Sequence, residues 1–272
     1  QINPLIAEAR FVRAFSYYHL VENFGDIPYI DAYIANPQMV EEISMAAKTP
    51  AAEVYAKVLE DFEFAKQWLP DQQPSDVRSR PTKGTAAPYL ATVHLTWADY
   101  QNAYNEAKWV IDNKATFDYS LEADFQNLFN AEEADNLKET IFSLDFLGQQ
   151  NGDRGANDDI MPPMTGIRGA EELAWSVCVP SLAVFTTWDD RDYRKEVSMT
   201  DSALVNGVME PYTVFAITKR PHIAKYRRYP GNSNAEGRYS DHNYATMRYA
   251  EVLLTLAEAE VRGLDPIRRR RH

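Results

Sequence analysis

Apolar residues at helical spacing predict two helices at the start of the chain. Between residues 3 and 23, apolar stripes occupy all of the helix surface except a narrow polar strip. Such a helix is packed on several sides. It should end at Gly25, ahead of Pro28. A second amphipathic helix is expected from Thr49-Pro50 to Pro70, with apolar residues three and four positions apart.

The next segment predicts a helical hairpin. A third helix begins near Thr82, and a fourth follows a short break at Asp99-Tyr100. Helices joined by so short a connection pack antiparallel, and alanines on the facing sides allow close approach. This arrangement is typical of tetratricopeptide-type repeats. The predicted fold class is therefore all-α, with tetratricopeptide-like helical hairpins.

The middle of the chain has a different pattern. A β-prone run at 139–144 leads into residues 148–174, whose low apolar content predicts a long loop. Three further predictions follow along the chain: a short helix from Pro180-Ser181 to Trp188, an irregular stretch at 200–243, and a last helix from about Asn243. We therefore expect one partial domain over 1–272, with a helical scaffold (1–147), a long, irregular, loop-rich ligand-binding excursion (148–243) and a final scaffold helix (244–262).

Composition and charge exclude several classes of protein. With 45% hydrophobic and 25% charged residues, the chain belongs to the folded globular class. Its net charge is −12, and it would be −16 without the four arginines at 268–271. Because nucleic-acid binding needs a cationic surface, we expect no nucleic-acid partner. No apolar run approaches the roughly 18 residues of a membrane span. Gln1 is interpreted as an internal start without a signal peptide.

Motifs for catalysis and for cofactors are absent. There is no G-x-S-x-G, G-x-G-x-x-G or H-E-x-x-H pattern, and the single cysteine, Cys178, excludes a disulfide framework and a cysteine-based zinc site. Two acidic clusters remain, at Asp153/Asp158/Asp159 and Asp189/Asp190/Asp192. Either could hold Ca²⁺ or supply an acid–base pair, whereas the alternative for the second is ion pairing with nearby arginines. We predict no catalytic residue, no metal and no cofactor.

Several segments, in order, resemble the SusD/RagB family of outer-membrane glycan-binding lipoproteins of Bacteroidetes. The most specific matches are the first helix with its turn (residues 8–18 and Phe24-Gly25-Asp26-Ile27-Pro28-Tyr29) and the last helix (residues 247–254 with Ala257-Glu258-Ala259). Weaker matches between them are Thr82-Lys83-Gly84-Thr85-Ala86-Ala87, Glu139-Thr140-Ile141-Phe142-Ser143, Trp175, Pro180-Ser181 and residues 188–192. Lys225-Tyr226 belongs to the specific match at the last helix. Each match also has a local explanation. For example, Asp26 caps a turn, and Arg248 pairs with Glu251.

The resemblance implies a function at the cell surface. It implies a lipid-anchored protein on the extracellular face of the outer membrane, with the anchoring cysteine upstream of Gln1. It also implies a partner, a SusC-like TonB-dependent transporter on which the protein acts as a lid, and a cargo of oligosaccharide or, in some relatives, peptide. At the other end, we interpret the arginine-rich tail as a truncation or frame artefact rather than a functional basic tail.

We expect the ligand to contact the loop-rich excursion. Trp175, at the family's tryptophan position, is the first candidate, because a flat aromatic ring stacks on the C–H face of a sugar. The alternative for Trp175 is a place in the core. Weaker candidates that could hydrogen-bond hydroxyl groups are Arg168, Asn157, Asp158 and Tyr212. Two other classes stay open as alternatives, an all-α glycoside hydrolase and a repeat scaffold for protein partners.

Overall fold

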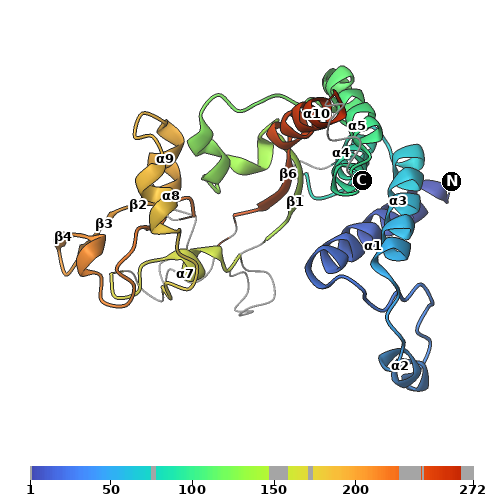
Figure 1. The fold of residues 1–272 in the computed structure, drawn as a ribbon, viewed down its shortest axis with the longest axis horizontal. Coiled ribbons are helices and arrows are strands. Elements are labelled where there is room, and N and C mark those ends of the chain that lie inside the picture. The colour runs from blue at the N-terminus through green and yellow to red at the C-terminus, as the bar shows by residue number, and fades with distance from the viewer. Residues whose placement is uncertain are drawn as a thin grey trace. The chain divides into compact units, whose positions relative to one another are not determined.

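The computed structural model describes residues 2–74, 78–146, 159–170, 174–226, 240 and 242–264. The chain forms two compact units: unit 1 comprises residues 1–74, 80–119 and 249–272, and unit 2 comprises residues 75–79 and 120–248. The described residues contain ten α-helices and a few short strands, so the predicted all-α class is confirmed (Figure 1).

Unit 1 is a layer of packed helices. Its elements are α1 (Asn3–Phe24), α2 (Pro37–Ser44), α3 (Ala51–Trp68), α4 (Lys83–Thr96), α5 (Tyr100–Asp112), α6 (Lys114–Phe117) and α10 (Tyr249–Leu264). Helix α1 packs on α3, α3 on α4, α4 on α5, and α5 on α10, the element most distant in sequence (Figure 1). The four helices predicted up to residue 112 are all present, and α4 and α5 form the predicted hairpin.

Aromatic rings from three helices form the core of unit 1. The rings of Phe11 and Phe62 meet edge to face at 5.4 Å, and Tyr89 stacks on Phe62 at the same centroid distance. All three side chains are fully buried. Such aromatic pairs stabilise a core beyond the area that they bury.

Helix α1 differs from the prediction in one respect. Its buried residues follow a single stripe, Ala7, Phe11, Ala14, Tyr18 and Val21. Leu5 and Val12, on the other predicted stripe, are 66% and 54% exposed. Within the part of the chain that the structure describes, α1 therefore packs through one face, and our prediction of packing on several sides is wrong.

The turn after α1 connects two helices. Gly25 ends α1 with φ +66°, a backbone conformation that glycine adopts at low cost. The next residue, Asp26, accepts a hydrogen bond from the N–H of Ala51 at 2.8 Å, and Ile27 exchanges two backbone hydrogen bonds with Thr49. Asp26 therefore caps the N-terminus of α3, 25 residues away, rather than its own turn.

Unit 2 consists of short elements joined by loops. These are η1 (Phe125–Phe129), η2 (Ala134–Asn136), β1 (Thr140–Leu144), α7 (Met161–Thr165), α8 (Leu182–Thr187), α9 (Tyr193–Ser198), β2 (Met199–Thr200), β3 (Ser202–Val205), β4 (Val208–Pro211), η3 (Tyr212–Val214), β5 (His222–Ile223) and β6 (Tyr244–Arg248). The predicted short helix and the strand at 140–144 are confirmed. The 200–243 stretch is more ordered than expected, because it contains the β3–β4 hairpin and strand β5, which pairs with β2.

The last predicted helix begins later than expected. Residues 244–248 form β6, which pairs antiparallel with β1, and α10 starts only at Tyr249. Arg248 at the end of β6 donates to Glu139, just before β1, at 2.6 Å. Arg248 thus pairs with a residue more than one hundred positions away, a partner that sequence spacing did not suggest. A partner strand remote in sequence overrides the local helical pattern.

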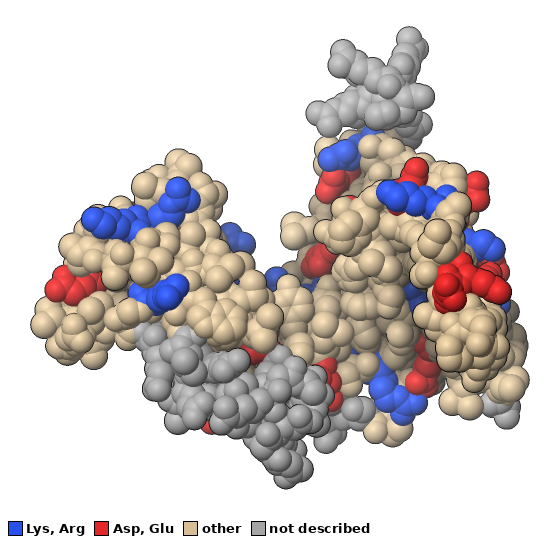
Figure 2. All heavy atoms as spheres, turned by 90° about the horizontal axis from the view of Figure 1, so that it is seen from below, with Lys and Arg blue, Asp and Glu red and all other residues tan. Residues whose placement is uncertain are grey.

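Two surface properties bear on partners. On the face shown in Figure 2, basic and acidic side chains of the described residues alternate, without one continuous basic surface. In the portions of the chain that are described, no helix has the length and apolarity needed to cross a membrane.

Candidate functional site

Trp175 lies on a short segment that is hydrogen-bonded to α7. The N–H of Trp175 donates to the Pro163 carbonyl at 2.8 Å, and those of Val177 and Cys178 donate to Met164 at 2.9 and 3.0 Å. Carbonyls at the C-terminal end of a helix have no partner within the helix, so this segment satisfies them. Trp175 itself is 39% exposed. It is therefore not a core tryptophan, and its ring can be reached from solvent.

Ser176, the next residue, has an unusual backbone and several partners. Its φ is +52°, in the left-handed region that non-glycine residues rarely adopt. Its N–H donates to the Gly166 carbonyl at 3.0 Å, and its hydroxyl oxygen accepts the N–H of Arg168 at 2.9 Å. The same oxygen lies 2.9 Å from Nε2 of His222, which is fully buried. Ser176 thus joins the Trp175 segment to two other parts of unit 2.

Arg168 lines a small cavity. The cavity has a volume of about 290 Å³, and its wall includes Glu210, Val214 and Phe215. Arg168 is exposed, so its guanidinium is available to hydrogen-bond acceptors in this cavity.

Tyr212 lies beside the same cavity. It begins η3, whose last residue Val214 lines the cavity wall. Its N–H donates to the Asp201 carbonyl at 2.7 Å, and its ring meets Phe185 edge to face at 6.2 Å. The structure therefore brings the neighbours of Tyr212 next to Arg168. Asn157 and Asp158, the remaining candidates, lie outside the described residues.

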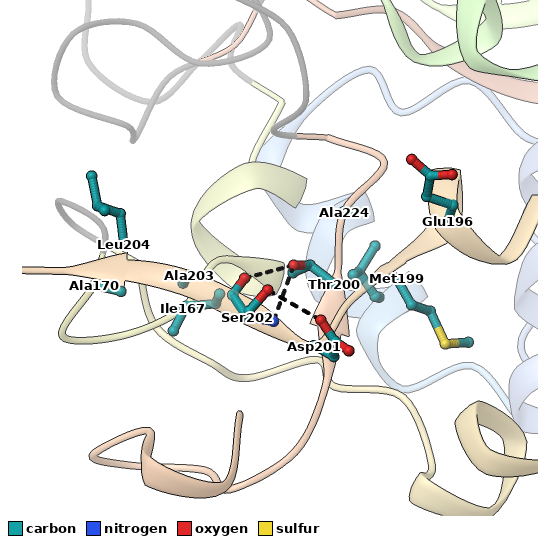
Figure 3. A pocket seen from close by; sticks show the side chains of 11 residues that line it. Ile167, Ala170, Glu196, Met199, Thr200, Asp201, Ser202, Ala203, Leu204 and Ala224 are labelled. Atoms are coloured by element: carbon teal, nitrogen blue, oxygen red, sulfur yellow. Dashed lines mark hydrogen bonds between the residues drawn. The ribbon is translucent and has the colours of Figure 1, made fainter. Parts of the chain in front are cut away.

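A second, larger cavity adjoins the first. Its volume is about 540 Å³, and the two cavities share Ile167 and Ala170 in their walls. Figure 3 shows Thr200, Asp201 and Ser202 side by side at its centre. The Ser202 hydroxyl lies 3.1 Å from an Asp201 carboxylate oxygen, and Thr200 donates to the Ser202 carbonyl at 2.7 Å. Aliphatic side chains form other parts of the wall, namely Ile167, Met199, Leu204 and Ile223.

Sequence reasoning missed this larger cavity. A signal for part of it was present, because Asn206-Gly207 between β-prone residues is typical of a tight hairpin. Both residues have positive φ, +49° and +81°, as that turn requires. The hairpin carries Ser202 and Leu204 of the wall. Which loop faces the hairpin could not be derived from local pattern.

Among the described residues, no group of acidic, histidine or cysteine side chains is arranged to hold a metal ion, and the second acidic cluster is occupied by ion pairs. Within the 189–195 segment, three ion pairs join Asp189 to Arg191, Asp192 to Arg194 and Asp190 to Lys195. The Arg191 and Arg194 guanidiniums hold the pKa values of Asp189 and Asp192 below the usual range. Local ion pairing, the alternative left open by the sequence, is therefore what the structure contains. Of the first cluster, Asp153 and Asp158 lie outside the described residues.

Asp159 is a buried titratable group at the start of α7. One of its carboxylate oxygens accepts the N–H of Met161 at 2.9 Å, whereas the other is buried without a partner among the described residues. Burial disfavours the ionised form and raises the pKa of Asp159 to about 6. The helix to which the Trp175 segment is hydrogen-bonded thus has, just before its first turn, a carboxyl group with a raised pKa.

Comparison with known protein families gives two matches. A family described as starch-binding and associating with the outer membrane matches residues 1–95. A second, described as the SusD family, matches residues 181–264 and so includes the hairpin and α10.

Individual relatives agree with these matches. "SusD-like protein P2" of Formosa agariphila is 49% identical over 269 residues, which cover 95% of this chain and 52% of the relative. Among solved structures, a laminarin-binding SusD-like protein has a TM-score of 0.77 at 21% identity, over 96% of this chain and 60% of the other. A SusD-like carbohydrate-binding protein of Bacteroides fragilis has a TM-score of 0.75 at 20% identity, over 96% and 55%. The chain thus spans about half the length of the curated relatives that it matches.

Proposed function

This chain belongs to the SusD family, and from that premise we propose that it captures oligosaccharides at the surface around Trp175 and the two adjoining cavities. The observation that carries the proposal is the half-exposed Trp175 on a hydrogen-bonded segment. A ring that is both accessible and fixed can stack on a sugar at a small entropic cost.

The cavities would supply the polar contacts. Sugar hydroxyls need both donors and acceptors. Asp201 and Ser202 in the larger cavity and Arg168 in the smaller one provide them. The aliphatic wall of the larger cavity would contact the C–H groups of a sugar. One fold neighbour is a laminarin-binding protein, which is consistent with a glycan as the ligand class.

The rest of the function is also proposed from family membership. SusD-family proteins are binding proteins, so we assign no catalytic step to this chain. We propose that the whole protein is anchored by lipid to the extracellular face of the outer membrane. There it would cap a SusC-like TonB-dependent transporter and pass the captured glycan to it.

A binding experiment with a matched control tests the ligand site. Trp175→Ala and Trp68→Ala remove tryptophans that are equally exposed, at 39% each, and Trp68 lies on α3 in unit 1. A glycan array identifies a ligand, and calorimetric titration then measures its affinity. We expect Trp175→Ala to lower the affinity at least about tenfold, the loss of one aromatic contact, and Trp68→Ala to leave it unchanged.

Three results would contradict the proposal. The first is wild-type affinity in a folded Trp175→Ala variant. The second is the release of reducing ends from the bound glycan, because turnover would indicate the hydrolase alternative. The third is binding to peptides without binding to any glycan, which would indicate the peptide-binding alternative.

A further inference from the structure

A chain of hydrogen bonds passes through Ser176. The Nδ1 atom of His222 lies 2.9 Å from the Arg220 carbonyl, which can only accept, so Nδ1 carries a proton. In the neutral ring Nε2 is then an acceptor for the Ser176 hydroxyl at 2.9 Å, and the Gly166 carbonyl is a second acceptor for the same hydroxyl at 3.3 Å. The Ser176 oxygen in turn accepts the N–H of Arg168. Burial lowers the pKa of His222, which favours this neutral form.

The ring of His222 is firmly held. His222 pairs with Thr200 in the β2–β5 ladder, and the centroid of the Phe215 ring lies 5.5 Å from that of the His222 ring. Because the side chain has no exposed surface, it cannot contact a glycan itself. Its hydrogen bond to Ser176 therefore acts on the structure around the ligand and not on the ligand.

The backbone of Ser176 indicates that this contact is under constraint. A left-handed conformation costs a non-glycine residue about 1 kcal/mol or more, so it persists only where the surroundings impose it. Here the imposing contacts are those of the Ser176 N–H with the Gly166 carbonyl and those of the hydroxyl with Arg168, His222 and the same Gly166 carbonyl. The residue that precedes this strained position is Trp175.

We propose that Ser176 and His222 are positioning residues of the glycan site, which fix the Trp175 backbone and the wall segment 167–170 relative to each other. The inference rests on the proposed function, because it assigns the two residues a role in preparing that site. Arg168 lines the smaller cavity and lies between Ile167 and Ala170, which line both cavities, and the Ser176 backbone belongs to the Trp175 segment. One serine thus connects the aromatic surface to the cavities.

A fixed site binds more tightly than a mobile one. Ordering a loop and a large side chain upon binding costs free energy, and a site ordered beforehand avoids that cost. Loss of the Ser176 hydroxyl should therefore leave the sugar contacts chemically intact and still weaken binding.

Two substitutions at one position separate positioning from stability. Ser176→Ala removes the hydroxyl and keeps the backbone strain, whereas Ser176→Gly removes both. Ser181→Ala is the control, because Ser181 is exposed and makes no side-chain cap hydrogen bond. Affinity for the glycan found on the array is measured by titration. The state of Trp175 is followed by fluorine NMR of 5-fluorotryptophan protein, in which Trp175→Phe assigns one of the five resonances.

We expect Ser176→Ala and Ser176→Gly to lower the affinity for the glycan by a similar factor, on the order of tenfold. Because glycine relieves the backbone strain, Ser176→Gly should unfold at a higher temperature than Ser176→Ala. In both, the Trp175 resonance should shift or broaden while the other four keep their positions. His222→Phe, which keeps a buried ring but has no acceptor, should move the same resonance. Ser181→Ala should match the wild type.

The inference is overturned if both Ser176 variants bind like the wild type with an unchanged Trp175 resonance. It is also overturned if affinity follows stability, so that Ser176→Gly binds like the wild type and Ser176→Ala does not. Failure of the proposed function can be distinguished from failure of this inference. If the proposed function is wrong, Trp175→Ala binds with wild-type affinity. The fluorine signal, in contrast, reports the positioning of Trp175 whether or not its ring contacts the glycan.

Discussion

Arg13 of α1 holds Asp61 of α3 through two charge-assisted hydrogen bonds, from Nε at 2.6 Å and from Nη2 at 2.8 Å. Asp61 is only 2% exposed, and Arg10 lies farther from it, at 3.5 Å. A planar guanidinium and a carboxylate in this geometry fix the register of two helices as well as their separation. The pair therefore aligns the first two long helices of unit 1.

Breaking this pair should destabilise the protein strongly. Arg13→Met leaves the buried Asp61 carboxylate with only the longer ion pair to Arg10, so we expect a loss of about 3 kcal/mol in the free energy of unfolding. Urea denaturation measures it. Lys108→Met is the control, because Lys108 and Asp112 form an exposed pair within one helix and such pairs contribute little. Equal losses in the two variants would contradict this role of Arg13.

Asp26 should stabilise α3 through its cap. Asp26→Ala removes the acceptor of the Ala51 N–H and should lower the free energy of unfolding by about 1 kcal/mol. Asp26→Asn keeps a side-chain oxygen at the same place and should restore most of the loss. If Asp26→Asn is as unstable as Asp26→Ala, the carboxylate acts through its charge and not as a cap.

Gly84 lies where no side chain fits. A Cβ at this position would lie 2.6 Å from Cγ of Phe117 and 2.8 Å from the Tyr119 hydroxyl. Although alanine favours helices, Gly84→Ala should therefore destabilise the protein by about 1–3 kcal/mol. Gly263→Ala is the matched helical control, because its nearest neighbour is at an ordinary 3.5 Å. Thermal unfolding of both variants tests this, and a stable Gly84→Ala protein would refute it.

Asp159 should make stability depend on pH. Its folded pKa, about 6, lies above the ordinary value of 3.8, so the folded state binds the proton more tightly than the unfolded state. Protonation of Asp159 therefore contributes on the order of 2–3 kcal/mol to the free energy of unfolding. This stabilisation is fully present below pH 3.8 and is lost as the pH rises through about 6. Asp159→Asn removes this titration and keeps an oxygen for the Met161 N–H.

Measurement at two pH values isolates the effect of this carboxyl group. Urea denaturation at pH 5 and pH 8 gives the change in the free energy of unfolding with pH, for the wild type and for Asp159→Asn. The contributions of all other titrating groups cancel when the two changes are subtracted. We expect the variant to gain stability relative to the wild type at pH 8. An equal difference at both pH values would show that the carboxyl does not titrate in this range.

The sequence by itself determined the helices that depend on residues close together in the chain. Periodic apolar residues located α1, α3, α4 and α5, and Gly25 marked the end of α1, because a helix depends on neighbours three and four positions away. The order of motifs also identified the family.

Tertiary structure decided everything that depends on remote partners. Asp26 caps a helix 25 residues away, and Arg248 pairs with Glu139 across the β1–β6 ladder, which turns the expected start of the last helix into a strand. The cavity wall and the Ser176–His222 contact likewise join segments that are far apart in the chain. Neither spacing nor periodicity encodes such pairs, because a side chain's partner is set by how the elements pack and not by its position along them.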